Sequence, residues 1–326
     1  MLENKVNVTT IGGGTGSYNV LTGLKGFENL NLASIVTMSD SGGSTGVLRD
    51  EFGILPPGDL RRAILALSQE SEVLRKLFEY RFEKKSSVSG HTVGNLLITA
   101  MADITGDFEA GLQEVSKMFR VKGKVVPVTK EKSDLCVKLE NGEIIEGETN
   151  IDCPVHDANL LIIDAFLKPE VSVNPRAKDV LENSDIIIIG PGDLYTSIIP
   201  NLLVKGVKEA IANSDAKVVY FCNIMTKHGE TTNFEVIDFV NVVERYLGVG
   251  NLDYVIVNNG YISEEMVEKY EEEDMKQPVK LKDISDFEGK SYKVIERDLL
   301  NETDFVRHKP EKLAAVISDI IDGWVK

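Results

Sequence analysis

Residues Val6 to Gly26 have the sequence VNVTTIGGGTGSYNVLTGLKG, in which an apolar run meets a cluster of glycines and then a helix-like segment. Val and Ile dominate residues 5–11, which is typical of a buried strand, and residues 17–25 are predicted to form a helix. Between them lie Gly12, Gly13, Gly14, Thr15 and Gly16. A strand, a glycine turn and a helix point free backbone amides at one place, which suits a nucleotide phosphate. A tight turn without a ligand is the alternative.

The rest of the chain alternates between strand-like and helix-like segments. Further buried strands are predicted at residues 31–38, 185–189, 216–222 and 254–258. Apolar residues at helical spacing lie between them, as in the stripe of Val236, Phe239, Val240, Val243 and Leu247. Strands that alternate with helices form a parallel sheet covered on both faces. We therefore expect an α/β fold, Rossmann-like and three-layered (α/β/α), with a mainly parallel sheet.

We expect a single domain over residues 1–326, with a β-rich insertion at residues 121–174 that contains a small β-hairpin. The segment CVKLENGEIIEGE (residues 136–148) carries Asn141-Gly142, which is a strong hairpin turn. Two helices before this insertion are also predicted. Asp59 is expected to cap the first. The second is expected to carry Val93, Leu96, Leu97, Ala100 and Met101 at helical spacing.

Composition excludes several classes of function. The net charge of −16 repels polyphosphate backbones and anionic membrane surfaces, so we expect no nucleic-acid partner. The longest aliphatic run, residues 186–189, is too short to cross a bilayer, and the first residues lack the apolar segment of a signal peptide. The three cysteines have no CxxC spacing, which fits a reducing compartment. We expect a cytoplasmic protein without membrane insertion.

A second polar loop follows the strand at residues 31–38. It contains SDSGGSTGVLRDEFGILPPGDLRRAI, residues 39–64, and its candidate ligand-binding residues are Asp40, Gly42, Gly43, Ser44, Thr45, Asp59 and Arg62. The glycine-rich part could hold an anion on its backbone amides. Asp40 could bind a divalent metal or a ribose hydroxyl, or it could serve only as a cap or turn residue. Of Arg61 and Arg62, one is expected to form only a surface salt bridge.

Two more polar loops follow later strands. GPGDLYTSIIPN begins at residue 190 and CNIMTKHGETTN at residue 222. Their candidate residues are Gly190, Gly192, Tyr195, Thr196, Ser197, Asn223, Met225, Thr226, Gly229, Glu230 and Thr231. Because the carboxyl ends of parallel strands meet at one edge of a sheet, these loops are expected to share one extended phosphorylated ligand.

Three further residues are candidates. His91, in SGHTVGN, could cap a helix or touch the ligand, and Asn95 closes the same segment. Arg307 is a candidate for binding phosphate through its forked guanidinium. No His and Cys residues have zinc-site spacing, and the sequence contains no GxSxG motif.

Several long segments resemble the gluconeogenesis-factor (YvcK-like) family. They are GGGTGS, DSGGSTGVLRDEFGILPPGDLRRA, GHTVGNLL, VVPVT, GPGDLYTSIIPNLLV and CNIMTKHGET, between Gly12 and about Asn258, with a weaker echo at VRHKPEKLA. That family is similar in turn to the CofD phospholactate transferases. The resemblance implies a Rossmann-like core, cytoplasmic homodimers and binding of a UDP-sugar, chiefly UDP-N-acetylglucosamine. It also implies a regulatory role in central carbon use and in cell-wall supply or cell shape.

The transferase relatives imply a related site that holds a guanosine nucleotide, a deazaflavin and a divalent metal. This chain departs from the family pattern in four places. Ser41 stands where a second aspartate is usual, which weighs against a metal at Asp40. Val47 replaces a common arginine, Asp193 a common serine, and Lys309 the usual acid after Arg-His.

Three functions follow as hypotheses. The favoured one is a regulatory protein that binds a nucleotide or nucleotide-sugar and signals to an unidentified protein partner. The second is a transferase that moves a phosphorylated group from a nucleotide anhydride to a deazaflavin or similar acceptor, with Asp40, Arg62 and His91 as candidate catalytic residues and Mg²⁺ bound with the nucleotide. The third, a nicotinamide dehydrogenase, explains only the first glycine loop and Asp40.

Overall fold

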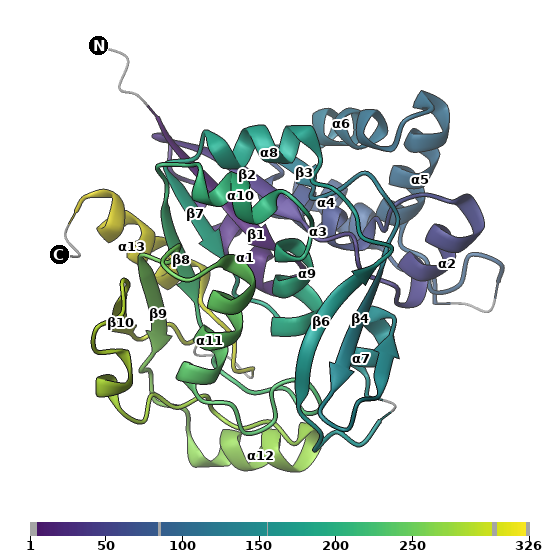
Figure 1. Cartoon of the computed structure of the whole chain (residues 1–326). Helices are drawn as coiled ribbons and strands as arrows, with labels where there is room; N and C mark the ends of the chain where they lie inside the picture. The colour runs from purple at the N-terminus through teal and green to yellow at the C-terminus, as the bar shows by residue number, and fades with distance from the viewer. Residues whose placement is uncertain (1–4, 84–85, 155, 302–304, 324–326) are drawn as a thin grey trace.

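The computed structural model describes residues 5–83, 86–154, 156–301 and 305–323. Within these ranges, seven parallel strands form one sheet in the order β10-β9-β8-β7-β1-β2-β3 (Figure 1). The strands are β1 (Val6–Gly12), β2 (Leu30–Val36), β3 (Lys124–Pro127), β7 (Ile186–Ile189), β8 (Lys217–Phe221), β9 (Tyr254–Asn258) and β10 (Lys293–Arg297). The predicted α/β fold with a mainly parallel sheet is confirmed.

The strand order reverses beside β1. The chain runs outward from β1 through β2 to β3, then returns to form β7 on the other side of β1 and runs outward again. Ile11 of β1 pairs with Ile189 of β7, and Gly12 pairs with Val36 of β2. In an open α/β sheet, such a reversal leaves a crevice at the carboxyl ends of the two central strands. The glycine loop after β1 and the loop after β7 therefore begin next to each other.

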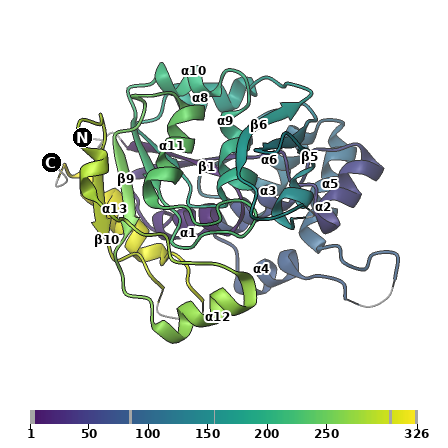
Figure 2. The same cartoon turned by 60° about the horizontal axis from the view of Figure 1, so that its bottom comes forward.

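Helices cover both faces of the sheet (Figure 2). One layer contains α1 (Gly14–Leu24), which packs between α3 (Gly58–Leu67) and α13 (Pro310–Ile321). The opposite layer contains α8 (Pro175–Glu182), α9 (Ile199–Leu202), α10 (Val207–Ala212) and α11 (Val236–Leu247). A one-turn π-helix, η1 (Leu194–Ile198), leads into α9. This is the three-layer arrangement expected from the alternating sequence.

Three additions extend this core: two sets of helices and a small antiparallel sheet. Between β2 and β3 lie α2 (Gly43–Phe52), α4 (Glu72–Glu79), α5 (Val93–Thr105) and α6 (Phe108–Met118), and α12 (Glu264–Asp274) and the short η2 (Ile284–Phe287) lie between β9 and β10. A three-stranded antiparallel sheet, β5-β4-β6, is formed by β4 (Asp134–Leu139), β5 (Ile144–Glu146) and β6 (Ile162–Lys168), with α7 (Glu148–Asp152) beside it. It lies within the predicted insertion, residues 121–174, whereas β3, also in that range, is an edge strand of the main sheet.

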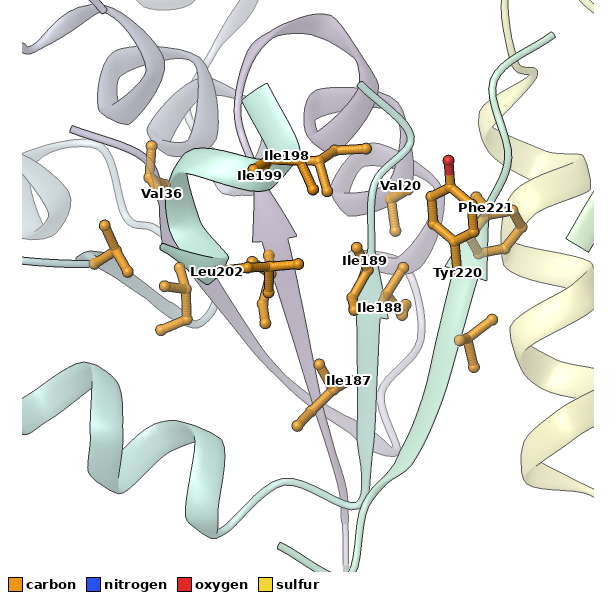
Figure 3. Close-up of a cluster of buried hydrophobic side chains, with 14 of the residues drawn as sticks. Val20, Val36, Ile187, Ile188, Ile189, Ile198, Ile199, Leu202, Tyr220 and Phe221 are labelled. Carbon is orange, nitrogen blue, oxygen red and sulfur yellow. The ribbon is translucent and has the colours of Figure 1, made fainter. Parts of the chain in front are cut away.

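The core is centred on β7. Ile186 to Ile189 are all buried. Because successive side chains of a strand point to opposite faces, four buried isoleucines require apolar cover on both. Figure 3 shows Ile187 to Ile189 among side chains from neighbouring elements, including Val20 of α1, Leu202 of α9 and Phe221 of β8. This packing fixes the carboxyl end of β7.

One helix prediction was wrong in detail. The helix after Pro57 begins at Gly58, so Asp59 lies in its first turn and is not its cap. The predicted helix at Val93 is confirmed as α5, and its apolar residues Val93, Leu96, Leu97, Ala100 and Met101 are half-buried or exposed. The buried residues are instead Gly94, Asn95, Ile98, Thr99 and Ala102. A hydrogen bond from Arg61 Nε to Asn95 Oδ1 (3.0 Å) turns this polar face inward.

Close packing of α1 against α13 predicts a destabilising substitution. A Cβ at Gly23 would overlap the main chain of Pro310, lying 2.8 Å from its carbonyl carbon and 3.2 Å from Ala314 Cβ. We expect Gly23→Ala to lower the free energy of unfolding in urea by about 2 kcal/mol, since the added methyl group must push the helices apart. Gly26→Ala is the matched control, because nothing lies within 4 Å of its Cβ position. Equal stability of the two variants would contradict this packing.

Candidate functional site

A pocket of about 920 Å³ opens at the carboxyl ends of the central strands. Its walls come from the β1–α1 loop, the loop after β2, the first turn of α3, α7, the loop after β7, the loop after β8, α12 and residues 305–308. This volume is near the upper end of the range for sites that hold small molecules and cofactors. Segments from across the chain therefore enclose one site of the size that an extended ligand needs.

Glycines bring the loops after β1 and β7 into direct backbone contact. A Cβ at Gly16 would overlap the carbonyl group of Pro191, and one at Gly13 would overlap the Asp59 carboxylate. Gly14 has a φ of 63°, a conformation that favours glycine. Since α1 begins at Gly14, its first amides have no intrahelical acceptor, and the Gly14 amide donates to Asp59. The amides of Thr15 and Gly16 follow in the same first turn.

The predicted site residues fall into two groups. Those that line the pocket are Gly13, Gly14, Thr15, Gly16, Asp40, Gly42, Asp59, Arg62, Gly192, Thr196, Ser197, Asn223, Met225, Thr226 and Arg307. Those outside its lining are Gly12, Gly43, Ser44, Thr45, His91, Asn95, Gly190, Tyr195, Gly229, Glu230 and Thr231. The four polar loops thus reach one pocket, while several of their residues support its walls from behind.

His91 belongs to a buried hydrogen-bond network behind the second loop. Its Nδ1 lies 2.9 Å from Ser44 Oγ, and Asn95 Nδ2 donates to the same hydroxyl at 3.2 Å. Asn95 also accepts from Arg61, which is buried. Satisfied buried networks of this kind fix the orientation of the elements that they join. These residues hold α2, α3 and α5 together, so Arg62 is the arginine of the pair that faces the pocket.

Three carboxylates crowd one wall of the pocket. Burial and the nearby Asp40 carboxylate raise the pKa of Asp59 to about 6, and the same two causes raise the pKa of Glu148 to about 8. Asp40 Oδ1 accepts from the Gly42 amide at 2.9 Å, and Glu148 Oε2 accepts from the Ser41 amide at 3.3 Å. The closest cation is Arg62, whose Nη1 lies 3.9 Å from Asp59 Oδ1. Burial and the crowding of these carboxyl groups therefore favour the protonated forms of Asp59 and Glu148.

Lys227, which sequence reasoning missed, joins three acidic side chains at another wall. Its Nζ lies 2.9 Å from both Asp193 Oδ2 and Glu230 Oε1, and it also pairs with Asp152 of α7. Burial lowers the pKa of Lys227, but these carboxylates outweigh burial and raise it overall. The three carboxylates lie close enough to hold a metal, yet the ammonium group already occupies the space among them.

Glu230 connects this cluster to the wall formed by η1. It is buried and accepts from the Tyr195 amide at 3.2 Å and from Thr196 Oγ1 at 3.3 Å.

The only sequence signal for Lys227 was its position in a polar loop at a strand end, between Thr226 and Glu230.

The far end of the pocket is formed by α12 and residues 305–308, and most of its residues were also missed. Tyr270 Oη accepts from the Val306 amide at 3.1 Å, and the Arg307 guanidinium lies 5.1 Å from the centre of the Phe305 ring. Lys269, Glu273 and Lys276 line the same end. The acidic composition of α12 resembles an ordinary solvated helix, so nothing in its sequence indicated a site.

Comparisons with known proteins find relatives over nearly the whole chain. A family model described as 2-phospho-L-lactate transferase CofD matches residues 8–300. A gluconeogenesis factor from Bacillus subtilis is 39% identical over 98% of this chain and 99% of its own length. Another, from Halalkalibacterium halodurans, is 40% identical over 96% of each chain. A solved structure of a UPF0052 family member from Bacillus halodurans is 38% identical, has a TM-score of 0.90, and aligns over 96% of this chain and 99% of its own.

Membrane insertion was not expected from the sequence. Among the helices of the described residues, none is long and apolar enough to span a bilayer.

The crowded carboxylates predict a pH dependence of stability. The pKa of Glu148 is higher in the folded state than the ordinary glutamate value of 4.5, so the native state keeps a proton that the unfolded state has released. Stability should therefore fall as the pH rises from about 4.5 through about 8. We expect Glu148→Gln to remove on the order of 3 kcal/mol of this loss, measured by urea unfolding at pH 5.5 and pH 9.

Glu143→Gln is the matched control for that measurement, because Glu143 is an exposed carboxylate in the nearby turn between β4 and β5. It should keep the pH dependence of the unmodified chain. A Glu148→Gln variant whose stability changes with pH as much as that of the control would show that Glu148 is not the group responsible.

Proposed function

This chain belongs to the CofD family, and we propose that within it the protein binds a nucleotide-sugar of the UDP-N-acetylglucosamine type and acts as a regulatory protein. The relatives named gluconeogenesis factor support a role linked to gluconeogenic growth. A link to cell-wall supply or cell shape is part of the same proposal.

The observation that carries this proposal is the convergence of four polar loops on one pocket. The first turn of α1 offers backbone amides and a positive helix end, which suit a diphosphate. Arg62 stands at the same wall with its side chain 46% exposed, so its guanidinium is available to a ligand. Asn223, Met225 and Thr226 line the continuation of the pocket, where we place the nucleoside or the sugar.

A divalent cation would fit the wall that carries Asp40, Asp59 and Glu148. Their oxygens are the hard ligands that Mg²⁺ prefers, and a bound cation would favour the ionised forms of Asp59 and Glu148, whose pKa values are raised by burial and by Asp40. Asp59 takes the place of the second carboxylate that Ser41 cannot supply. Mg²⁺ would neutralise charge between this wall and a diphosphate, and we propose it as a companion of the nucleotide.

The alternative function is a CofD-like transfer of a phosphorylated group from a nucleotide anhydride to a deazaflavin or similar acceptor. The match to the transferase family model and the carboxylate wall favour it. His91 takes no part in this version, because it lies in the network behind the pocket. Incubation with Mg²⁺, a nucleotide-linked donor and a deazaflavin acceptor tests it, and a phosphorylated product would establish turnover.

We further propose a cytoplasmic homodimer and a separate protein partner. Val73 and Leu77 of α4 are 75% and 53% exposed, and large exposed apolar side chains of this kind are typical of surfaces that another protein covers. Light scattering from the purified chain measures the oligomeric state.

Calorimetric titration with UDP-N-acetylglucosamine and Mg²⁺ tests the main proposal. We expect binding to the unmodified chain and a loss of about tenfold in affinity for Arg62→Gln, since one charged hydrogen bond to phosphate is removed. Gly16→Ala should weaken binding further, because its methyl group would separate the two loops at Pro191.

Arg297→Gln is the matched control, because this arginine is exposed on β10 and does not line the pocket. It should bind as the unmodified chain does. Absence of heat with the unmodified chain at millimolar ligand would overturn the proposal.

A further inference from the structure

Two buried acceptor atoms at the pocket have no hydrogen-bond donor. His308 lines the pocket and is 8% exposed, and its Nε2 has no partner among the described residues. Asn223 lines the same pocket, and its Nδ2 donates to the Gly192 carbonyl at 2.8 Å. Its Oδ1 is buried and, within the described ranges, also lacks a partner. Buried polar atoms are almost always paired, so two unpaired ones at a pocket wall need an explanation.

The hydrogen bonds of these residues determine what the two atoms can accept. The ring of His308 donates to the Cys222 carbonyl, and since Nε2 has no partner, the donor is Nδ1. Burial lowers the pKa of His308 to about 4, so the ring is neutral at physiological pH and Nε2 carries a lone pair. Asn223 follows Cys222 directly in the chain, so the two acceptors come from one small region.

We propose that His308 Nε2 and Asn223 Oδ1 form a subsite that accepts hydrogen bonds from a pair of neighbouring sugar hydroxyls of the ligand. This inference rests on the proposed function, which places a nucleotide-sugar in the same pocket. Two acceptors cannot hold an anion. This subsite therefore suits a different part of the ligand from the backbone amides and the arginine, which suit the diphosphate. A vicinal diol supplies two donors side by side, whereas a uracil ring supplies a single N–H.

Substitution of His308 separates the acceptor from the structural role of the ring. In His308→Asn the amide nitrogen takes the place of Nδ1 and can still donate to the Cys222 carbonyl, while the Nε2 acceptor is removed. In His308→Gln the side chain again presents an acceptor near the position of Nε2. Tyr292→Phe is the matched control, since it removes another buried, unpaired polar atom that lies outside the pocket lining.

Titration of these proteins with UDP and its 2′-deoxy, 3′-deoxy and N3-methyl analogues tests the proposal. For the unmodified chain and Tyr292→Phe, we expect one or both deoxy analogues to bind about tenfold more weakly than UDP. His308→Asn should bind UDP about tenfold more weakly and should discriminate little against the deoxy analogues. His308→Gln should recover part of the affinity.

The same analogues distinguish a ribose from the other sources of a donor. If only UDP-N-acetylglucosamine, and not UDP, responds to His308→Asn, the diol is that of the hexose, and the subsite stands. If only the N3-methyl analogue binds weakly, the donor is the base N–H, and the proposal of a diol is overturned. Equal binding of UDP, all its analogues and UDP-N-acetylglucosamine to every variant overturns the subsite altogether.

A second readout does not depend on affinity. The chain has four histidines, so the ¹⁵N signals of His308 can be assigned by comparison with His308→Asn. Nε2 should shift on addition of UDP or UDP-N-acetylglucosamine, and an unchanged signal at saturation contradicts the proposal. If the unmodified chain binds no nucleotide, the proposed function itself fails. Binding without discrimination removes only the subsite.

Discussion

The site depends on backbone-to-backbone contact between the loops that follow the two central strands. Gly16 at the start of α1 lies against the carbonyl group of Pro191, at a distance that leaves no room for a side chain. The strand order creates this meeting point, because β1 and β7 are neighbours at the reversal of the sheet. The buried isoleucines of β7 hold one loop in place, and the packing of α1 holds the other.

Charge is distributed unevenly around the pocket. Three carboxylates stand at the wall near Asp40, whereas at the wall near Lys227 a buried ammonium group joins three others. Lys227 therefore has the structural role that a bound metal ion has in many other proteins. Its ammonium group joins α7, which lies beside the small sheet, to the loops after β7 and β8. Among the described residues, the wall near Asp40 has only the half-exposed Arg62, 3.9 Å from Asp59, within ion-pairing distance, which is why we propose an external cation there.

The fold could be predicted from the sequence because its main signals are local. Strand-like runs that end in glycine, followed by helical stripes, define a parallel sheet, and the position of each polar loop at a strand end follows from that sheet. The face of α5 could not be predicted, since it depends on a hydrogen bond between Arg61 and Asn95 from different helices. For the same reason, the contacts of Lys227 and His308 could not be predicted, because the residues around them come from distant segments of the chain. His91, by contrast, had the right residue type in a suggestive motif, yet its partner Ser44 directs it away from the pocket.

Helix α1 connects the proposed diphosphate site with the segment that contains His308. Its first turn faces the proposed diphosphate, and five residues later Asn19 Nδ2 donates to the His308 carbonyl at 3.1 Å. A helix rises about 1.5 Å per residue, so these two attachment points are offset by about 7.5 Å along a rigid rod. This spacing would set the distance between the proposed diphosphate and sugar subsites. We propose that a compound too short to reach both subsites binds at only one of them, so that the length of the ligand contributes to its selection.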